Sequence, residues 1–422
     1  MLENSKSIGC HTGGFRLALH SRFGNVLTLD VAMSSSNRRL TVLVYGDIGG
    51  SIGYIRYCEG LFGNSAIPED LDVTFVCSTD LYEKIKPLSS RIHVIAHPWP
   101  SSRSRIHRYL WHLFVYPCIV HRTSPDIEFY PSGQLRVYLR KAVTVATCHN
   151  LLLFDDEELE RLKTEKEKQF FQKYRRTQSR SLLRASGVIF LSEHSRHVVQ
   201  SKLQGIVAST VIGHGLDPRF RVEIERSYEL PATISVLYVS PILLYKNQAN
   251  VVRAIRWLRE KTKKNLHLRL VGGGSPEALR ELNNVIRSEN AEPFVELVGM
   301  ISYEQMADEY RRADIFLFAS ASETFGITLL EAMGAKLAIA CSDRTGLEEF
   351  LKDAGVYFSP ADPHSIAGAL EMLISDQQLR QTLGDRAYRY SQEYTWERSR
   401  LKTFDFIRAI YERSGRPQES DI

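Results

Sequence analysis

The sequence predicts an α/β protein made of two domains, each built on a doubly wound parallel sheet. Its 422 residues, 43% apolar and 24% charged, are enough for two or three globular domains. Short, continuous apolar runs alternate with helical segments, as is typical of strands buried on both faces. This alternation stops in the polar tract 221–231 and begins again at Ile234, so we expect two Rossmann-like domains facing across a cleft.

The domain boundaries follow these changes in pattern. Residues 1–38 lack sustained periodicity and are predicted to be a poorly ordered N-terminal extension. Residues 39–222 form the predicted first domain, and residues 232–395 form the second. The amphipathic helix that begins the final segment, 396–422, is expected to return to the first domain.

Composition excludes several classes of function. The net charge of +5 allows an anionic ligand or an anionic membrane surface, but it is too small for a nucleic-acid-binding protein. The six cysteines are scattered without metal-ligand spacing, which indicates a reducing compartment and no zinc site. Neither a membrane-spanning run nor a signal sequence is found, so a cytoplasmic protein is expected.

The first domain offers two candidate sites at strand ends. A glycine-rich loop, Gly46–Gly53, follows the first strand and could hold a phosphate, although a tight turn explains it equally well. His149 follows the strand 142–148, where it could bind a sugar hydroxyl or be satisfied by a neighbouring carbonyl. The predicted strands of this domain are 40–45, 71–77, 91–96, 126–130, 142–148 and 188–191.

Two helical segments of the first domain are unusually charged. The segment 103–121 is basic, aromatic and amphipathic, so it could lie on an anionic bilayer. The plainer interpretation is a core helix with a solvated basic edge. Residues 158–183 are predicted to form one long, highly charged helix.

The second domain has three polar or glycine-rich sites, each after a strand. They are Lys246 within the segment 245–247, the loop Gly272–Gly274 and the segment Glu323–Gly326. The predicted strands are 234–240, 265–271, 294–299, 315–318, 337–341 and 356–358. A lone lysine would usually be a solvated loop residue, but three such sites in order indicate a ligand pocket at one sheet edge.

The segment from Ala313 to Gly334 carries the most specific pattern. A buried strand, a turn of small residues and a helix starting near Gly326 create an anion site, because the helix dipole and unpaired N–H groups point the same way. Glu323 and Glu331 flank this helix start, and carboxylates accept hydrogen bonds from sugar diols. The segment therefore suits a diphosphate joined to sugar rings, although a surface acid before a helix and another in its second turn are the plainer interpretation of this spacing alone.

The E-x7-E spacing of Glu323 and Glu331 resembles the motif of the retaining glycosyltransferases of family 4, also called glycosyl transferases group 1. The resemblance covers about residues 40–411 and implies the GT-B fold. Matching segments are HN (149–150), GVIFLSEHSR (187–196), VIGHGLD (211–217), YVSPILLYKN (238–247) and LVGGG (270–274). HNLLLFDDEE and LLYKN are similar to members that build bacterial surface polysaccharides.

The resemblance implies a role for each matching residue. Lys246 would contact the donor diphosphate, Glu331 the ribose and Glu323 the transferred sugar, with His149 beside that sugar. His149, Glu323 and Lys246 are thus the expected catalytic group. The other expected donor-binding residues are Gly50, Gly273, Thr324, Phe325, Gly326 and Ile327.

The implied reaction is the transfer of a sugar, with retention, from a UDP- or GDP-sugar to a glycan or lipid-linked saccharide, without a metal or other cofactor. The expected location is the cytoplasm, with peripheral contact to the inner face of the membrane. One departure is Ser240, which stands where the family commonly has a phosphate-binding arginine. Two alternatives remain: a catalytically weak nucleotide-sugar-binding partner subunit, and a sugar-nucleotide epimerase of the same fold.

Overall fold

The structure is a computed structural model. It describes residues 17–20, 26–29, 39–46, 52–63, 67–101, 104–136, 143–162, 164–221 and 226–415. The chain forms two units, 1–39 and 40–422. In the first unit, β1 (Leu17–His20) and β2 (Val26–Leu29) pair antiparallel. The predicted N-terminal extension otherwise lies outside the described residues.

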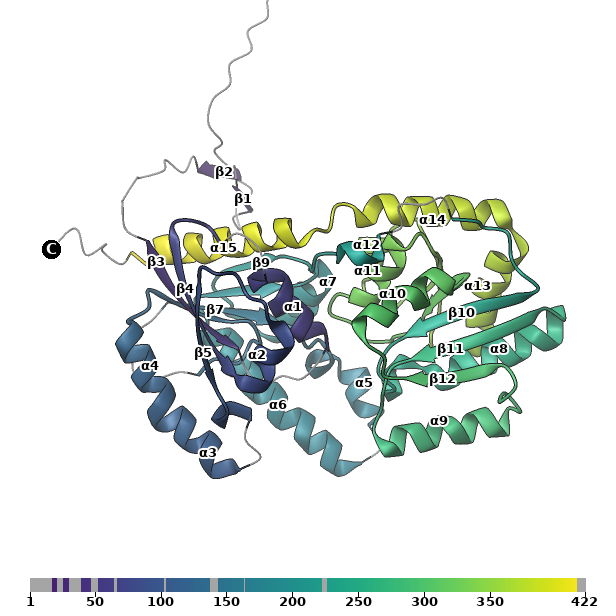
Figure 1. Cartoon of the computed structure of the whole chain (residues 1–422), viewed down its shortest axis with the longest axis horizontal. Coiled ribbons are helices and arrows are strands. Elements are labelled where there is room, and N and C mark those ends of the chain that lie inside the picture. The colour runs from purple at the N-terminus through teal and green to yellow at the C-terminus, as the bar shows by residue number, and fades with distance from the viewer. Residues whose placement is uncertain are drawn as a thin grey trace, which may run out of the picture. The chain divides into compact units, whose positions relative to one another are not determined.

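Two parallel sheets form the second unit, as predicted (Figure 1). The first sheet has the order β5-β4-β3-β6-β7-β8-β9, and the second has the order β12-β11-β10-β13-β14-β15. The first contains β3 (Leu40–Gly46), β4 (Leu71–Ser78), β5 (Ile92–His97), β6 (Ile127–Tyr130), β7 (Val143–Cys148), β8 (Gly187–Phe190) and β9 (Ser209–Val211). The second contains β10 (Thr233–Val239), β11 (Asn265–Val271), β12 (Val295–Gly299), β13 (Ile315–Phe318), β14 (Ala338–Ser342) and β15 (Val356–Phe358).

Each sheet reverses its strand order once, at a switch point where open α/β sheets bind ligands. In the second sheet this point lies between β10 and β13, which pair in parallel. In the first sheet it lies between β3 and β6. The strands at both points are buried apolar runs, which explains why their positions could be predicted.

Helices flank both sheets (Figure 1). Those of the first domain are α1 (Ile52–Phe62), α2 (Thr79–Ile85), α3 (Arg105–Leu110), α4 (Tyr116–Thr123), α5 (Asp156–Glu160), α6 (Glu165–Arg184) and α7 (Glu193–Lys202). The later helices are α8 (Gln248–Thr262), α9 (Pro276–Ser288), α10 (Tyr303–Arg312), α11 (Ile327–Gly334), α12 (Glu348–Leu351), α13 (Pro363–Ser375), α14 (Gln377–Ser391) and α15 (Trp396–Arg413).

The prediction of one helix over 158–183 is wrong. The segment divides into α5 and α6, because Thr164 and Glu167 form a capping box that starts a new helix. The segment 103–121 is also interrupted, by a π-helical turn at Trp111–Val115 between α3 and α4. Its buried Trp111 confirms that one face of the segment belongs to the core.

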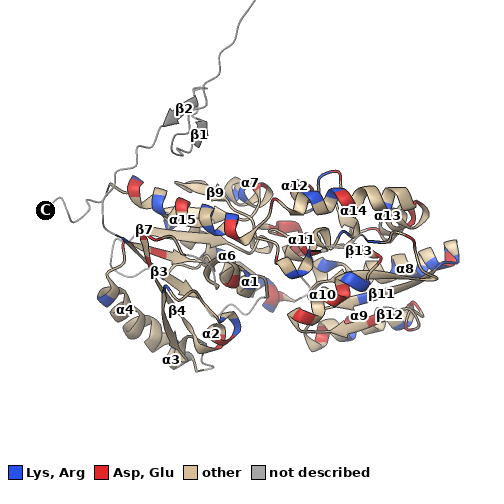
Figure 2. Ribbon diagram, turned by 45° about the horizontal axis from the view of Figure 1, so that its top comes forward, with Lys and Arg blue, Asp and Glu red and all other residues tan. Residues whose placement is uncertain are grey.

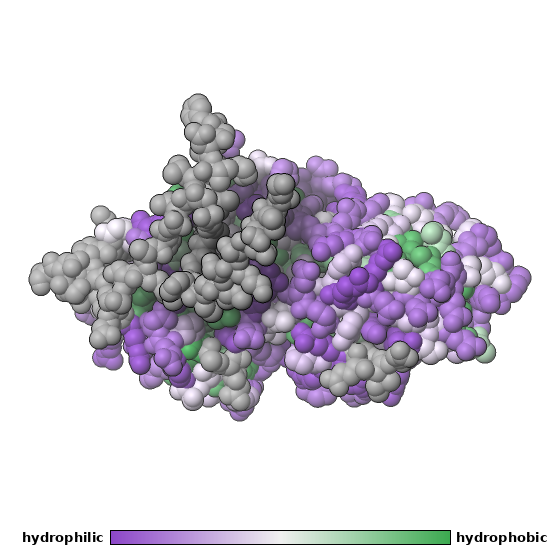
Figure 3. Space-filling model, turned by 90° about the horizontal axis from the view of Figure 1, so that it is seen from above, coloured by the Kyte–Doolittle hydropathy of each residue, from purple (hydrophilic) through white to green (hydrophobic). Residues whose placement is uncertain are grey.

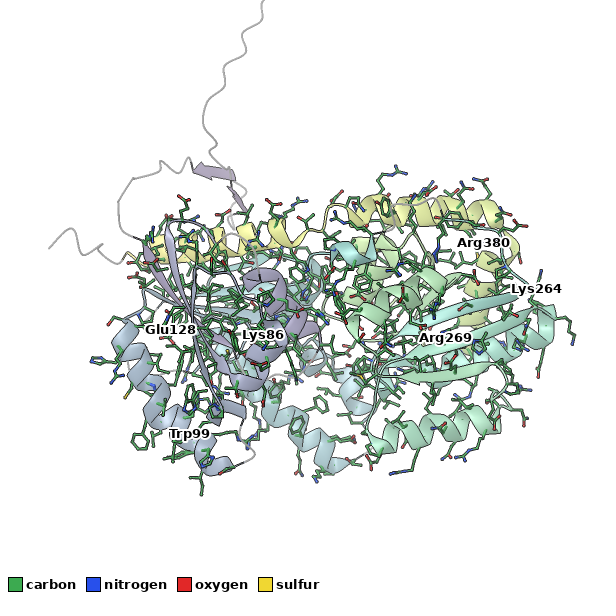
Figure 4. All side chains as sticks on the ribbon, viewed as in Figure 1. Lys86, Trp99, Glu128, Lys264, Arg269 and Arg380 are labelled. Carbon is green, nitrogen blue, oxygen red and sulfur yellow. The ribbon has the colours of Figure 1, made fainter. Side chains whose placement is uncertain are left out.

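The C-terminal helix α15 returns to the first domain, as predicted (Figure 1). Arg408 of α15 forms a salt bridge with Asp70 at 2.8 Å, and Phe404 lies near Phe62 with ring centroids 6.4 Å apart. The preceding α14 binds the chain between the domains, since Arg380 (labelled in Figure 4) donates to the carbonyl of Tyr228. No helix within the described ranges is long and apolar enough to span a membrane.

Candidate functional site

Lys246 and Glu323 meet at the switch point of the second sheet. Lys246 follows β10 and Glu323 follows β13, and because these neighbouring strands are parallel, their carboxyl ends lie together. The two side chains form an ion pair and are only 7% and 15% exposed. Burial acts to lower the pKa of Lys246, but the Glu323 carboxylate outweighs it and raises that pKa above its ordinary value. The alternative of a solvated lysine is therefore wrong.

Two helices at this point, α8 and α11, begin without a side-chain cap. Their N-cap residues, Asn247 (φ 54°) and Gly326 (φ 78°), adopt the left-handed conformation. By contrast, Ser, Asp or Thr side chains cap α9, α10, α13, α14 and α15. An uncapped helix start offers backbone N–H groups to an anion, so α11 provides such a site beside Glu323.

Glu331 lies in the second turn of α11 and is 4% exposed, so it is not the surface acid of the alternative interpretation. The hydroxyls of Tyr310 and Tyr303 lie 2.8 Å and 3.3 Å from its two carboxyl oxygens. Burial raises the pKa of Glu331 to about 7, although the hydrogen bonds from Tyr310 and Tyr303 act to lower it. Near neutral pH this acid can therefore carry or release a proton.

Thr324 ties the start of α11 to the first domain. Its hydroxyl donates to the carbonyl of His149 at 2.9 Å and accepts from the N–H of Leu151 at 3.1 Å. Its carbonyl accepts from the Ser192 hydroxyl at 2.7 Å. The resemblance gives Thr324 a donor-binding role, and in the structure its side chain joins the strand-end loops of the first sheet to the second domain.

His149 lies directly after β7 and is neutral at physiological pH. Burial lowers its pKa to about 3, against a hydrogen bond to the Pro131 carbonyl that acts to raise it. This bond matches the alternative of a strand-end histidine satisfied by a carbonyl. However, its Nε2 is buried without a partner among the described residues. The ring packs near Tyr57 and His214, with centroids 4.6 Å and 5.8 Å away.

The other residues expected to bind the donor differ in which of their atoms could contact a ligand. The Phe325 side chain is buried against His214, so only its backbone is available to a ligand at the start of α11. The carbonyl of Gly273 accepts from the N–H of Ile242 at 2.8 Å, which brings the glycine loop beside the loop of Ser240. Ile327 is the first residue of α11 and follows Gly326. Gly50 lies outside the described residues.

Three residues near Glu331 were not predicted from the sequence. Tyr303 and Tyr310 are seven residues apart on α10, a spacing that places them on one helix face and could have indicated a pair. Arg56, from α1 of the first domain, lies over the Tyr303 ring at 3.3 Å from its centroid. Arg56 could not be predicted, because the apolar pattern of α1 does not show which side of this helix meets the second domain.

The comparison with protein families matches residues 223–390 to the family "Glycosyl transferases group 1". Residues 223–390 form a glycosyl transferases group 1 domain. Lys246, Glu323 and Glu331 all lie within this domain. Among the described residues, no three His, Cys, Asp or Glu side chains converge as metal ligands would.

Curated relatives are similar to this protein over part of the chain. O-antigen chain mannosyltransferase B of Escherichia coli is 25% identical over 187 residues, covering 44% of this chain and 48% of the relative. D-inositol 3-phosphate glycosyltransferase of Kineococcus radiotolerans is 28% identical over 193 residues, covering 42% and 43%. The match thus spans less than half the length of either relative.

Solved structures match much more of the chain. Sucrose-phosphate synthase from Thermosynechococcus elongatus has a TM-score of 0.68 at 18% identity, covering 89% of this chain and all of that one. HepE from Anabaena, in complex with UDP and glucose, has a TM-score of 0.66 at 16% identity, covering 87% and 99%. These likenesses show the fold, which is GT-B as predicted.

Proposed function

We propose that this protein is a retaining glycosyltransferase that moves a sugar from a UDP- or GDP-sugar to a glycan or lipid-linked saccharide. The observation that carries the proposal is the Lys246–Glu323 ion pair beside the uncapped start of α11, with Glu331 one turn further on. This arrangement offers a cation and N–H groups to a diphosphate and carboxylates to sugar hydroxyls. The group 1 domain and the fold support the same class of reaction.

The donor would exchange partners with the ion pair. A diphosphate at the start of α11 would attract the Lys246 ammonium, which frees the Glu323 carboxylate to accept hydrogen bonds from the transferred sugar. The bond between the anomeric carbon and the phosphate oxygen breaks, and the lysine and helix N-terminus stabilise the negative charge that develops. No resident metal is required for this step.

The acceptor would attack from the face that the diphosphate leaves. The acceptor hydroxyl forms a bond to the anomeric carbon, and its proton passes to the departing phosphate oxygen. Configuration is then retained without a covalent glycosyl-enzyme intermediate, so both glutamates act in binding. The neutral imidazole of His149, at the facing strand end, would bind a hydroxyl of the transferred sugar through Nε2, which is buried without a partner among the described residues.

A glycan or lipid-linked acceptor in surface-polysaccharide synthesis is supported by the E. coli relative, whose name refers to O-antigen chains. The surface of α3 and of the π-helical turn Trp111–Val115 supports access to a membrane. Its outward side carries Ile106, Tyr109, Leu113 and Phe114, which are between 47% and 69% exposed. The segment contains no acidic residue, and α3 and α4 carry only basic and uncharged residues in Figure 2.

Such a surface fits a peripheral contact with an anionic bilayer, in which apolar side chains enter the headgroup region and basic groups remain outside. The face shown in Figure 3, which carries α14 over the second domain, is mostly hydrophilic where residues are described. The contact is therefore proposed only for α3 and the π-helical turn that follows it. The two interpretations of the segment 103–121 therefore apply to different faces. Its inner face packs in the core, and its outer face is proposed to contact the membrane.

A vesicle experiment tests the membrane contact. The protein is sedimented with phosphatidylglycerol-containing or pure phosphatidylcholine vesicles at low salt, alongside Leu113→Ser/Phe114→Ser and the exposed control Phe170→Ser. Burying such a side chain fully is worth about 1.5–3 kcal/mol, so the double variant should lose at least about tenfold in partitioning. Equal loss in the control, or no wild-type binding to anionic vesicles, would contradict the contact.

A donor screen tests the reaction itself. The protein is incubated with UDP- and GDP-sugars, and release of the nucleoside diphosphate is followed by coupled assay and by NMR of the sugar. Slow hydrolysis or transfer with retained anomeric configuration is expected for at least one donor. Binding without turnover under every acceptor would favour the partner-subunit alternative, and conversion of one sugar nucleotide to another would favour the epimerase.

A further inference from the structure

The hydrogen-bond contacts around Glu331 restrict which oxygen atoms can carry a proton. The Tyr310 oxygen lies 2.8 Å from one carboxyl oxygen of Glu331 and 3.0 Å from the carbonyl oxygen of Thr328. A phenol has one proton, and a carbonyl can only accept. If Glu331 were ionised, the Tyr310 hydroxyl could satisfy the carboxylate or the carbonyl, but it could not fully satisfy both.

A proton on Glu331 removes this conflict. The carboxylic acid donates to the Tyr310 oxygen, and the Tyr310 hydroxyl donates to the Thr328 carbonyl. The Tyr303 hydroxyl donates to the other carboxyl oxygen at 3.3 Å. Each of these three contacts then has one donor and one acceptor, so the single proton of Tyr310 is not shared between two acceptors.

The charges that face Glu331 do not alter this assignment. Arg56 from α1 acts to hold the pKa of Glu331 down, and Asp217, from the loop before the short helix 218–220, acts to raise it. Arg219 lies over the Tyr303 ring, and from α10 the site is faced by Tyr303 and Tyr310. Burial is the largest influence on this acid, and it favours the neutral form.

We infer that, below neutral pH, Glu331 is a protonated carboxylic acid in the ligand-free protein, and that it releases this proton when a nucleotide ribose binds. The second half of this inference rests on the proposed function. The two ribose hydroxyls are donors that a carboxylate can accept on both oxygens, whereas a carboxylic acid uses one oxygen to donate. The O–H bond of Glu331 breaks, the proton leaves to solvent, and the ribose replaces the longer contact from Tyr303.

The ligand-free state is tested first. Infrared difference spectra between wild type and Glu331→Gln, recorded from pH 5 to 9, should contain a protonated-carboxyl C=O band that disappears as the pH rises through about 7. Glu309→Gln is the matched control, because Glu309 is also buried but forms a salt bridge with Arg269. A missing band at pH 5, or the same band in the Glu331→Gln protein, would overturn the protonation.

Proton release is tested by calorimetry with UDP-glucose and GDP-mannose in buffers of different ionisation enthalpy. At pH 6 the wild type should release close to one proton per bound donor, and at pH 9 none. The affinity should fall about tenfold for each pH unit below 7, and Glu309→Gln should behave like the wild type. Donor binding at pH 6 without proton release would overturn the inference and leave the proposed function standing.

Failure of both donors to bind would count against the proposed function instead. The infrared measurement needs no ligand, so it still decides whether Glu331 is protonated. Tyr303→Phe adds a check on geometry, since it removes the hydroxyl that the ribose is expected to replace. Its proton release at pH 6 should match that of the wild type, and loss of the release would contradict the proposed exchange.

Discussion

The Lys246–Glu323 pair gives the most direct prediction about stability. In Lys246→Met the ammonium is removed, and the Glu323 carboxylate, 15% exposed, is left without its cation. Breaking a buried pair from one side typically costs about 3–5 kcal/mol, because one charge remains buried and unpaired. The partial exposure of Glu323 places the expected loss near the lower end, at about 3 kcal/mol.

The double variant Lys246→Met/Glu323→Gln separates charge from packing. With both charges removed, the unfolding free energy should return to within about 1 kcal/mol of the wild type, since neutral replacements of buried pairs are often tolerated. Lys261→Met is the matched control, because the Lys261–Glu371 pair is exposed and should be worth at most about 1 kcal/mol.

Urea denaturation at neutral pH, followed by fluorescence and circular dichroism, measures all four proteins. The urea midpoints of the wild type, the double variant and the control Lys261→Met should be similar. The midpoint of Lys246→Met should be clearly lower. A loss in Lys246→Met no larger than in Lys261→Met would refute the buried pair. A double variant as unstable as Lys246→Met would also refute it, because the loss of stability would then come from packing and not from an unpaired charge.

Three further predictions concern the start and the second turn of α11. Thr324→Val should lower the unfolding free energy by about 1–3 kcal/mol, because it leaves the His149 carbonyl without its donor, while Thr324→Ser should keep the wild-type urea midpoint. Gly326→Ala should cost about 1–2 kcal/mol, since Gly326 has φ 78°, whereas Gly368→Ala, in open space on α13, should not destabilise. Burial raises the pKa of Glu331 from 4.5 to about 7, so the bound proton stabilises the fold below pH 4.5, and this contribution of about 3 kcal/mol is lost as the pH rises from 4.5 to 7. Because the lowered pKa of His149 has the opposite effect on wild-type stability, the loss is measured as the difference in unfolding free energy between wild type and Glu331→Gln, and a difference that stays constant between pH 4.5 and pH 8 would contradict it.

Much of the fold could be predicted because buried parallel strands appear in the sequence as continuous apolar runs. Ile315–Phe318 is such a run, and its predicted limits agree with β13. The division of the 158–183 helix could not be predicted in this way, because it depends on the local hydrogen bonds of Thr164 and Glu167 rather than on periodicity.

The candidate site was predictable where it follows chain order. Lys246 and Glu323 each follow a strand, so a parallel sheet must bring them to one edge. That they neutralise each other could not be predicted, since it depends on side-chain conformation. The contact of Arg56 with Tyr303 depends on how the two sheets are oriented toward each other. A local sequence pattern does not determine that orientation.

In the proposed reaction, Lys246 and Glu323 bind the donor of the transferred sugar. The most direct test compares the rate of nucleoside diphosphate release from the best donor in wild type, Lys246→Ala, Glu323→Ala and the control Lys261→Ala. Both site variants should lose about 100-fold or more, the size expected for a group that stabilises developing charge, while the control keeps the wild-type rate. Full activity in both site variants would show that the donor is bound and cleaved elsewhere.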